Sequence, residues 1–196
     1  MLAVCADKLL RAGVDRHRAD LQTGEISNFS LPRRFDLVAA PYRVIQALAS
    51  EREIEGFFRC IHAHLAPGGS CILNAFSPLR ALDGMRRHWI TAGETFNWDV
   101  PYEGGRLVRH DRRWRMDIER QVLYPELAYR RYADGKMLDE VVLGIVMRFW
   151  YPDEFVRLVE SYGFQVVGRW GRYKGELYGK GPELVLQFRE APQLQH

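Results

Sequence analysis

Apolar residues recur at near-helical spacing between Met1 and Ala12, which predicts a helix that stops at Gly13. A short extended strand is expected at Val14–Leu21, before a polar loop that runs to Pro32. The apolar positions of the predicted helix are Met1, Leu2, Cys5, Leu9 and Leu10.

The next segment has the pattern of a strand, a helix and a second strand. Phe35–Ala40 is a short apolar run without strict alternation, which predicts a strand buried on both faces of a parallel sheet. Ser50 and Glu53 form a capping box that opens a helix. A tight turn at Pro67–Gly69 is expected to end this helix and lead into a buried strand at Ser70–Phe76, so the segment is a βαβ unit. The inward stripe of the helix is Ile54, Phe57, Phe58, Ile61 and Leu65.

Between Thr95 and Trp150 helical periodicity is weak, and Tyr, Trp, Val and Arg are frequent. Asp134-Gly135 is typical of a two-residue hairpin turn. We therefore expect an antiparallel insert at residues 95–149 within a single domain of residues 1–196. Its predicted strands are Arg106–Met116, Ile118–Tyr132 and Lys136–Phe149.

A helix and two strands are expected to complete the domain. Pro152 suits the first turn of a helix, and Gly163 suits its end. Two strands joined by a Gly-rich loop follow, so the fold class is α/β. The inward residues of the helix are Phe155, Leu158 and Val159, and the strands are Phe164–Tyr173 and Glu183–Arg189.

Composition narrows the class of protein. The 196 residues are 47% hydrophobic and 27% charged, which excludes a disordered chain or a disulfide scaffold. No apolar run reaches the roughly 18–20 residues of a membrane helix, and no secretory signal is visible. Three cysteines without a CxxC pair favour a reducing, cytoplasmic setting without a metal site. The net charge is +3, and the 24 Arg and 4 Lys are interleaved with acids, so neither a nucleic-acid nor a membrane partner is expected.

Several short motifs occur in order along the chain. They are Met1-Leu2, Ala19-Asp20-Leu21, Phe35-Asp36-Leu37-Val38, Leu65-Ala66-Pro67-Gly68-Gly69, Tyr151-Pro152-Asp153-Glu154-Phe155, Gly163-Phe164, Gly171-Arg172-Tyr173-Lys174-Gly175 and Pro182-Glu183-Leu184-Val185. With them the chain resembles the C-terminal three-quarters of a class I S-adenosylmethionine-dependent methyltransferase of the small-molecule branch. The resemblance implies a Rossmann-like sheet, S-adenosylmethionine as cofactor and a small-molecule substrate.

One element of that family has no counterpart in the sequence. Family members begin with a strand, a GxGxG turn and a second strand ending in an acidic residue, which hold the methionine and ribose parts of the cofactor. The chain has no GxGxG, and Met1 aligns with an internal methionine, so we expect an N-terminally incomplete sheet. An open edge at Phe35–Ala40 then predicts self-association, and the lost contacts predict weak cofactor binding. Completion by another chain and an upstream start site both stay open.

The resemblance assigns cofactor contacts to Asp20, Leu21, Ala40, Pro41, Tyr42 and Gln46. Asp20 would accept from the adenine amino group and Leu21 would flank the ring; the alternatives are a solvated turn residue and a core leucine. Pro41 and Tyr42 follow a strand at the carboxyl edge, where open α/β sheets bind ligands. Their alternatives are a strand terminator and a surface aromatic. For Gln46 the alternative is an ordinary polar residue at the start of a helix.

The resemblance assigns acceptor contacts to Phe76, Arg148 and Tyr151. Arg148 and Tyr151 lie where the insert rejoins the domain, and in the family this junction closes over the active site. The alternative is that these residues only pack in a hinge, with a cation–π pair between Arg148 and Trp150. His110 lies in an Arg-rich strand and is considered as a general base for the acceptor, since histidine titrates near neutral pH. The sequence favours the other interpretation, in which His110 is a half-exposed histidine in a salt-bridged sheet.

The predicted function is methyl transfer from S-adenosylmethionine to a small-molecule acceptor, with the insert as a lid. No catalytic triad, carboxylate pair or P-loop is present, so no catalytic residue is assigned; methyl transfer requires mainly orientation of the reactants. His62 and His64 point to different faces of a helix and are expected to be surface histidines rather than metal ligands. The alternative function is a cofactor-deficient remnant that acts as an interaction partner.

Overall fold

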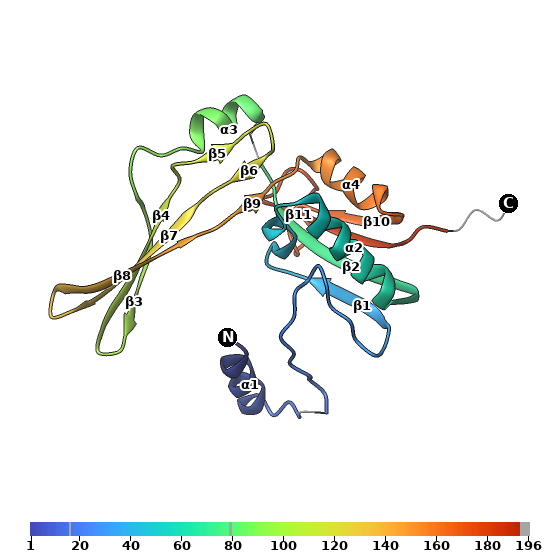
Figure 1. The fold of residues 1–196 in the computed structure, drawn as a ribbon, viewed down its shortest axis with the longest axis horizontal. Coiled ribbons are helices and arrows are strands. Elements are labelled where there is room, and N and C mark those ends of the chain that lie inside the picture. The colour runs from blue at the N-terminus through green and yellow to red at the C-terminus, as the bar shows by residue number, and fades with distance from the viewer. Residues whose placement is uncertain (16, 79, 193–196) are drawn as a thin grey trace.

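The computed structural model describes residues 1–15, 17–78 and 80–192, whose strands form three sheets (Figure 1). The core sheet contains β1 (Phe35–Ala40), β2 (Leu65–Phe76), β10 (Phe164–Trp170) and β11 (Glu183–Glu190). Its order is β1-β2-β11-β10, with β1 parallel to β2 and β11 antiparallel to both of its neighbours. The sheet is therefore mixed, with parallel and antiparallel pairs. Together with the helices it forms an α/β fold, in agreement with the Rossmann-like fold class that the sequence predicts.

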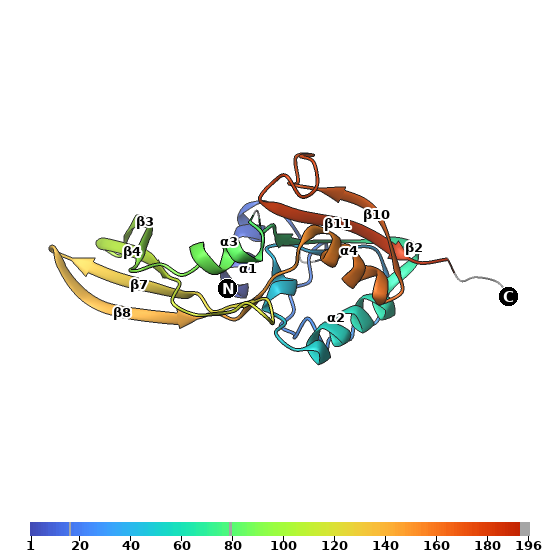
Figure 2. The ribbon, with the colours of Figure 1, turned by 90° about the horizontal axis from the view of Figure 1, so that it is seen from above.

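The predicted βαβ unit is confirmed. The Ser50 hydroxyl accepts the Glu53 N–H, and the Glu53 carboxylate accepts the Ser50 N–H at 2.9 Å, so the capping box opens α2 (Glu51–His64) as expected. α2 and α4 (Pro152–Ser161) lie on the same face of the core sheet (Figure 2). The core between them includes Ile54, Phe57, Phe58, Ile61, Leu65, Phe155, Val159, Phe164 and Phe188.

The strand predicted at Phe35–Ala40 is confirmed as β1, and it is an edge strand among the described strands. Its predicted burial on both faces is wrong, since only Ala40 is buried and Leu37 is 56% exposed. A second prediction, of a strand at Val14–Leu21, is also wrong. The described residues of Val14–Leu21 form no strand, since none of the described strands lies beside them to complete a ladder. A strand pattern without a pairing partner does not produce a strand.

The turn predicted at Pro67–Gly69 has a different role. α2 already ends at His64 and β2 begins at the next residue, so the turn lies inside the strand, where the register with β1 shifts. A Cβ on Gly69 would lie 2.9–3.0 Å from three backbone carbonyl oxygens, two of them in Phe35 and Asp36. Glycine therefore permits the close approach of β1 and β2 here, and does not end the helix.

Antiparallel strands between Thr95 and Arg148 extend as an arm away from the core sheet (Figures 1 and 2). The hairpin predicted at Asp134-Gly135 is confirmed, and both residues have positive φ. The three long strands predicted here are interrupted, and their residues are divided between a four-stranded sheet and a smaller, three-stranded sheet. One interruption is a turn in which the Gln121 N–H donates to the Ile118 carbonyl. The arm sheet consists of β3 (Thr95–Tyr102), which was not predicted, β4 (Gly105–Arg112), β7 (Glu126–Ala133) and β8 (Lys136–Gly144), and the smaller sheet of β5 (Met116–Asp117), β6 (Val122–Leu123) and β9 (Met147–Arg148).

The remaining helices are α1 (Leu2–Arg11), η1 (Val44–Ala47) and α3 (Leu82–His88). α1 was predicted, and Gly13 follows it with a φ of +68°, as expected for a helix stop. None of the residues of α1 is buried. No helix in the described part of the chain is long and apolar enough to cross a membrane.

Candidate functional site

A strained turn follows the carboxyl end of β1. Tyr42 and Arg43 have φ values of +60° and +63°, a region that costs a non-glycine residue about 1–3 kcal/mol. The Arg43 N–H donates to Asn74 Oδ1 at 3.0 Å, and Asn74 Nδ2 donates to the Glu183 carboxylate at 2.7 Å. The Arg43 guanidinium pairs with the same carboxylate. The turn is thus clamped to β2 and β11, while the Tyr42 side chain is 93% exposed.

The buried side chain of Gln46 connects the sheet to the arm. Its Nε2 donates to the Arg148 carbonyl at 2.6 Å, and its Oε1 accepts the Phe76 N–H at 2.8 Å. Both ends of the amide are therefore bound to backbone groups. Gln46 holds the carboxyl end of β2 against β9, where the insert returns to the sheet.

The structure brings two of the three predicted acceptor residues together. Phe76 and Tyr151 both pack around the buried Phe149, with ring centroids 6.2 and 6.0 Å from it. Desolvation is the main reason that the pKa of Tyr151 is raised, and the Tyr151 hydroxyl donates to the Arg80 carbonyl at 3.0 Å. An aromatic wall with one hydroxyl therefore lies beside the carboxyl end of β2.

The third predicted residue, Arg148, has other partners. Its guanidinium lies 2.7 Å from the Glu51 carboxylate and 5.9 Å from the centroid of the buried Trp150 ring. This is the cation–π packing that the sequence left as the alternative. The side chain ties β9 to the start of α2.

A hollow of about 570 Å³ lies between α1 and the segment that follows it. Asp20 and Leu21 line it, and the Asp20 carboxylate accepts from Gln22 Nε2 at 2.5 Å. None of the other predicted cofactor residues lines this hollow, so the structure divides the predicted set between the hollow and the carboxyl end of β1. The lining is Ala6, Asp7, Leu9, Leu10, Val14, Asp15, Ala19, Asp20 and Leu21.

This hollow fits the adenosine end of the implied cofactor. Small-molecule sites typically occupy roughly 300–1,000 Å³ and combine apolar walls with a few polar groups. Leu9, Leu10 and Leu21 supply apolar walls, and Asp20 supplies an acceptor for an exocyclic amino group. The described residues that line the hollow include no basic group for the carboxylate of the methionine end.

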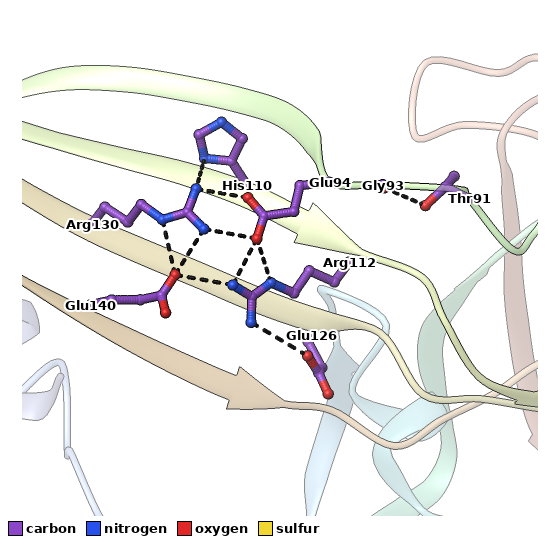
Figure 3. A network of polar contacts seen from close by, with 8 residues as sticks. All are labelled: Thr91, Gly93, Glu94, His110, Arg112, Glu126, Arg130 and Glu140. Atoms are coloured by element: carbon purple, nitrogen blue, oxygen red, sulfur yellow. Dashed lines mark hydrogen bonds and ion pairs between the residues drawn. The ribbon is translucent and has the colours of Figure 1, made fainter.

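His110 belongs to a network of charges on the arm (Figure 3). Its Nδ1 lies 3.4 Å from the Arg130 guanidinium, which together with Arg112 pairs with Glu94 and Glu140. Hydrogen bonds and charge from the two arginines lower the pKa of Glu94 to about 2. The salt-bridged sheet that the sequence favoured over a general base is therefore observed.

One histidine prediction is wrong, since His64 is buried rather than on the surface. Its Nε2 lies 2.8 Å from the Leu31 N–H, and its Nδ1 lies 2.7 Å from the Cys60 carbonyl. A loop packed over the end of α2 buries it, which helical periodicity alone does not indicate.

Sequence reasoning also missed the clamp formed by Arg43, Asn74 and Glu183. Asn74 carried a signal, because it is a lone amide inside an apolar strand and buried polar groups require partners. Arg43 and Glu183 are separated by 140 residues, so no local pattern links them.

The fold can be compared with known proteins. No family model and no curated protein matches the sequence. An S-adenosylmethionine-dependent methyltransferase from Clostridium acetobutylicum superposes with a TM-score of 0.73 at 11% identity, over 97% of this chain and 71% of that one. The chain has the fold of the class I S-adenosylmethionine-dependent methyltransferases. The fold that the sequence resemblance implies is therefore confirmed.

Two further solved structures share this methyltransferase fold. CalS10 from Micromonospora echinaspora, described as an amino pentose methyltransferase, has a TM-score of 0.62 at 19% identity, over 93% of this chain and 70% of CalS10. The glycopeptide N-methyltransferase MtfA, solved with S-adenosylhomocysteine, has a TM-score of 0.58 at 25% identity, over 97% of this chain and 68% of MtfA.

Proposed function

We propose that this chain is an enzyme that binds S-adenosylmethionine and transfers its methyl group to an amino group of a small, sugar-like molecule. The observation that carries the proposal is the agreement of the fold over 97% of the chain with a methyltransferase that uses this cofactor. The amino-sugar acceptor is supported by CalS10 and MtfA, which are described as acting on an amino pentose and on the nitrogen of a glycopeptide.

The residues of the chain would divide the work between two places. Asp20 and Leu21 would hold the adenine in the hollow beside α1, with Ala40 and Pro41 as a wall at the end of β1. Bound S-adenosylmethionine supplies an electrophilic methyl group, so the protein mainly orients the acceptor. Phe76 and Tyr151 would border that acceptor.

The arm is proposed to act as a lid over the acceptor. It rejoins the sheet through β9, whose backbone Gln46 holds beside the carboxyl end of β2. Movement of the arm would therefore be transmitted to the segment that carries Arg148 and Tyr151. Closure of such a lid excludes water and completes a site.

Calorimetric titration with S-adenosylmethionine tests the cofactor part. Asp20→Ala should weaken binding about tenfold or more, since a hydrogen bond to a charged group contributes about 1.5–3 kcal/mol. Glu25→Ala, an exposed acid outside the hollow, is the matched control. Absence of binding by the unaltered chain at millimolar cofactor would overturn the proposal, as would equal affinities of the two variants.

We also propose that the chain self-associates through the open edge of β1. One side of this strand has no partner among the described strands, and Leu37 is exposed there. Unpaired edges of this kind accept further strands, and lysine on an edge opposes such pairing. Sedimentation should show an oligomer that Leu37→Lys dissociates and the exposed loop variant Leu177→Lys does not. A monomeric unaltered chain would contradict the proposal.

A further inference from the structure

Another hollow, of about 320 Å³, lies where the strands of the arm sheet pass into the smaller sheet (Figure 1). None of the residues proposed above to hold the cofactor or the acceptor lines it. Small-molecule sites begin at roughly 300 Å³, so this hollow can hold a ligand built on one substituted ring. Its lining comes from all three crossings between the two sheets, and consists of Trp114, Arg115, Tyr124, Pro125, Glu126, Gly144, Ile145 and Val146.

The smaller sheet orients the side chains of this hollow. One residue from each of its strands packs into the apolar cluster around Phe149; these residues are Met116, Leu123 and Met147. Successive residues of an extended chain point to opposite faces, so the residues next to these three face away from the cluster. On the side of the arm sheet these neighbours are Arg115, Tyr124 and Val146, and all three line the hollow.

Backbone hydrogen bonds join the three crossings to one another. The Tyr124 N–H donates to the Arg115 carbonyl at 3.1 Å. The Ile145 N–H donates to the Pro125 carbonyl at 2.9 Å. Because Tyr124 and Pro125 are adjacent, the middle crossing is bound to a neighbour on each side. The walls of the hollow are thus ordered before a ligand enters, which lowers the entropic cost of binding.

Arg115 provides a positive charge in this hollow. Its guanidinium lies 3.9 Å from the centroid of the Tyr124 ring, which is a close cation–π contact. Arg112 and Arg130 of the arm form ion pairs, whereas no carboxylate in the described part of the chain pairs with Arg115. A guanidinium binds a carboxylate through two parallel hydrogen bonds. Arg115, held on the tyrosine ring, is therefore available to a carboxylate of a ligand.

Glu126 provides a negative charge in the same lining. Its carboxylate lies 3.8 Å from the Arg112 guanidinium (Figure 3). That guanidinium is closer to two other carboxylates, at 2.6 Å from Glu94 and 3.0 Å from Glu140. Glu126 is thus the least closely paired acid of this network, and its side chain is 40% exposed. An ammonium group in the hollow gives it a closer partner.

We propose that this hollow is a binding site for an aromatic α-amino acid, separate from the proposed methyl-transfer site. The carboxylate of the ligand pairs with Arg115, and its ammonium group pairs with Glu126. Its ring packs on Trp114, which lines the hollow and is 51% exposed. A ligand with only one charge leaves one of the two charged side chains without a partner, and a ligand without a ring leaves the indole exposed.

Titration of L-phenylalanine into the isotope-labelled full chain, followed by NMR, tests the proposal. A ligand of this size should bind at about millimolar concentration and shift the indole N–H signal of Trp114, which Trp114→Phe identifies by its loss. Phenylpropionate lacks the ammonium group and phenethylamine lacks the carboxylate. Each should bind about fivefold more weakly than L-phenylalanine, as expected for the loss of one partly exposed ion pair.

Charge variants test the two pairs separately. Arg115→Gln should abolish the preference for L-phenylalanine over phenethylamine, and Glu126→Gln should abolish the preference over phenylpropionate. Arg120→Gln, in the exposed turn between β5 and β6 and outside the lining, is the matched control and should keep both preferences. Melting curves identify any variant that fails to fold, and the three compounds compared on the unaltered chain then decide alone.

Three results would overturn the proposal. They are an unmoved Trp114 signal at saturating millimolar L-phenylalanine, equal binding of the three compounds by the unaltered chain, and loss of the preferences in Arg120→Gln as in Arg115→Gln. None of these measurements requires S-adenosylmethionine, so the proposed function can fail while the amino-acid site is supported, and the reverse.

Discussion

The Glu94 carboxylate lies 2.7 Å from the guanidinium of Arg130, two strands away on the arm sheet. The pair spans β4, and Arg112 joins it there at 2.6 Å from Glu94 (Figure 3). The two arginines would repel each other without Glu94 and Glu140 between them. Glu94 directly precedes β3, and Arg112, Arg130 and Glu140 lie in β4, β7 and β8, so the network links all four strands of the arm sheet.

The stability of the arm should depend on acid pH through Glu94. The pKa of Glu94 is lowered from 4.5 to about 2 by the Arg130 and Arg112 hydrogen bonds and charges. A lowered folded-state pKa contributes stability that is complete above the unfolded-state pKa near 4.5 and is lost as the pH falls toward 2. Glu94→Gln should flatten the fall in melting temperature between these pH values. Glu119→Gln, in an exposed pair with Arg86, should leave the fall unchanged; identical curves for both variants would contradict the prediction.

Gln46→Leu should destabilise the joint between the sheet and the arm. The substitution leaves the Phe76 N–H and the Arg148 carbonyl without their partner in a buried place. An unsatisfied buried polar group costs about 1–3 kcal/mol, so the free energy of unfolding in urea should fall by at least that amount. Gln165→Leu, on the exposed face of β10, is the matched control and should change it little. Equal losses for the two variants would show that Gln46 has no such role.

Gly56→Ala should destabilise the chain even though alanine favours helices. Gly56 is inside α2, where alanine normally adds about 1 kcal/mol of stability. Here the new Cβ would overlap the carbonyl oxygen of Ser27, in the loop that packs on the helix. Overpacking of this kind costs about 1–3 kcal/mol, so thermal unfolding should occur at a lower temperature. Gly144→Ala has open space around its Cβ and should be nearly neutral; a stabilised Gly56→Ala would contradict the packing described here.

Elements with local signals could be predicted from the sequence. The Ser50 and Glu53 capping box and the Asp134-Gly135 turn each specify their structure within four residues, and both are confirmed. Val14–Leu21 shows the limit of such reasoning, because a strand depends on a partner that its own residues do not encode. The same limit applies to the burial of β1, since its apolar composition does not show whether other elements cover both of its faces.

The candidate site was predictable only in part. The position of Tyr42 at a carboxyl strand end follows from the order of elements, and the structure places it there. The strained backbone of Tyr42 could not be predicted in this way. The strain depends on contacts of the next residue, Arg43, with Asn74 and with Glu183, which is 140 residues from Arg43. The role of Gln46 in joining β2 and β9 likewise depends on Arg148, which is 102 residues away.

His64→Ala should release the loop before β1 from α2. Because the Leu31 N–H can only donate, His64 Nε2 must accept from it, and the proton of the neutral ring is then on Nδ1, where it is donated to the Cys60 carbonyl. Without the imidazole, the Leu31 amide loses its acceptor and should exchange with solvent deuterium at least tenfold faster, as expected for loss of roughly 1.4 kcal/mol of local stability. His62→Ala, on the other face of α2, should leave Leu31 protected, since His62 contacts Tyr162 and Glu190 instead. Unchanged protection of Leu31 in His64→Ala would show that other contacts hold this loop in place.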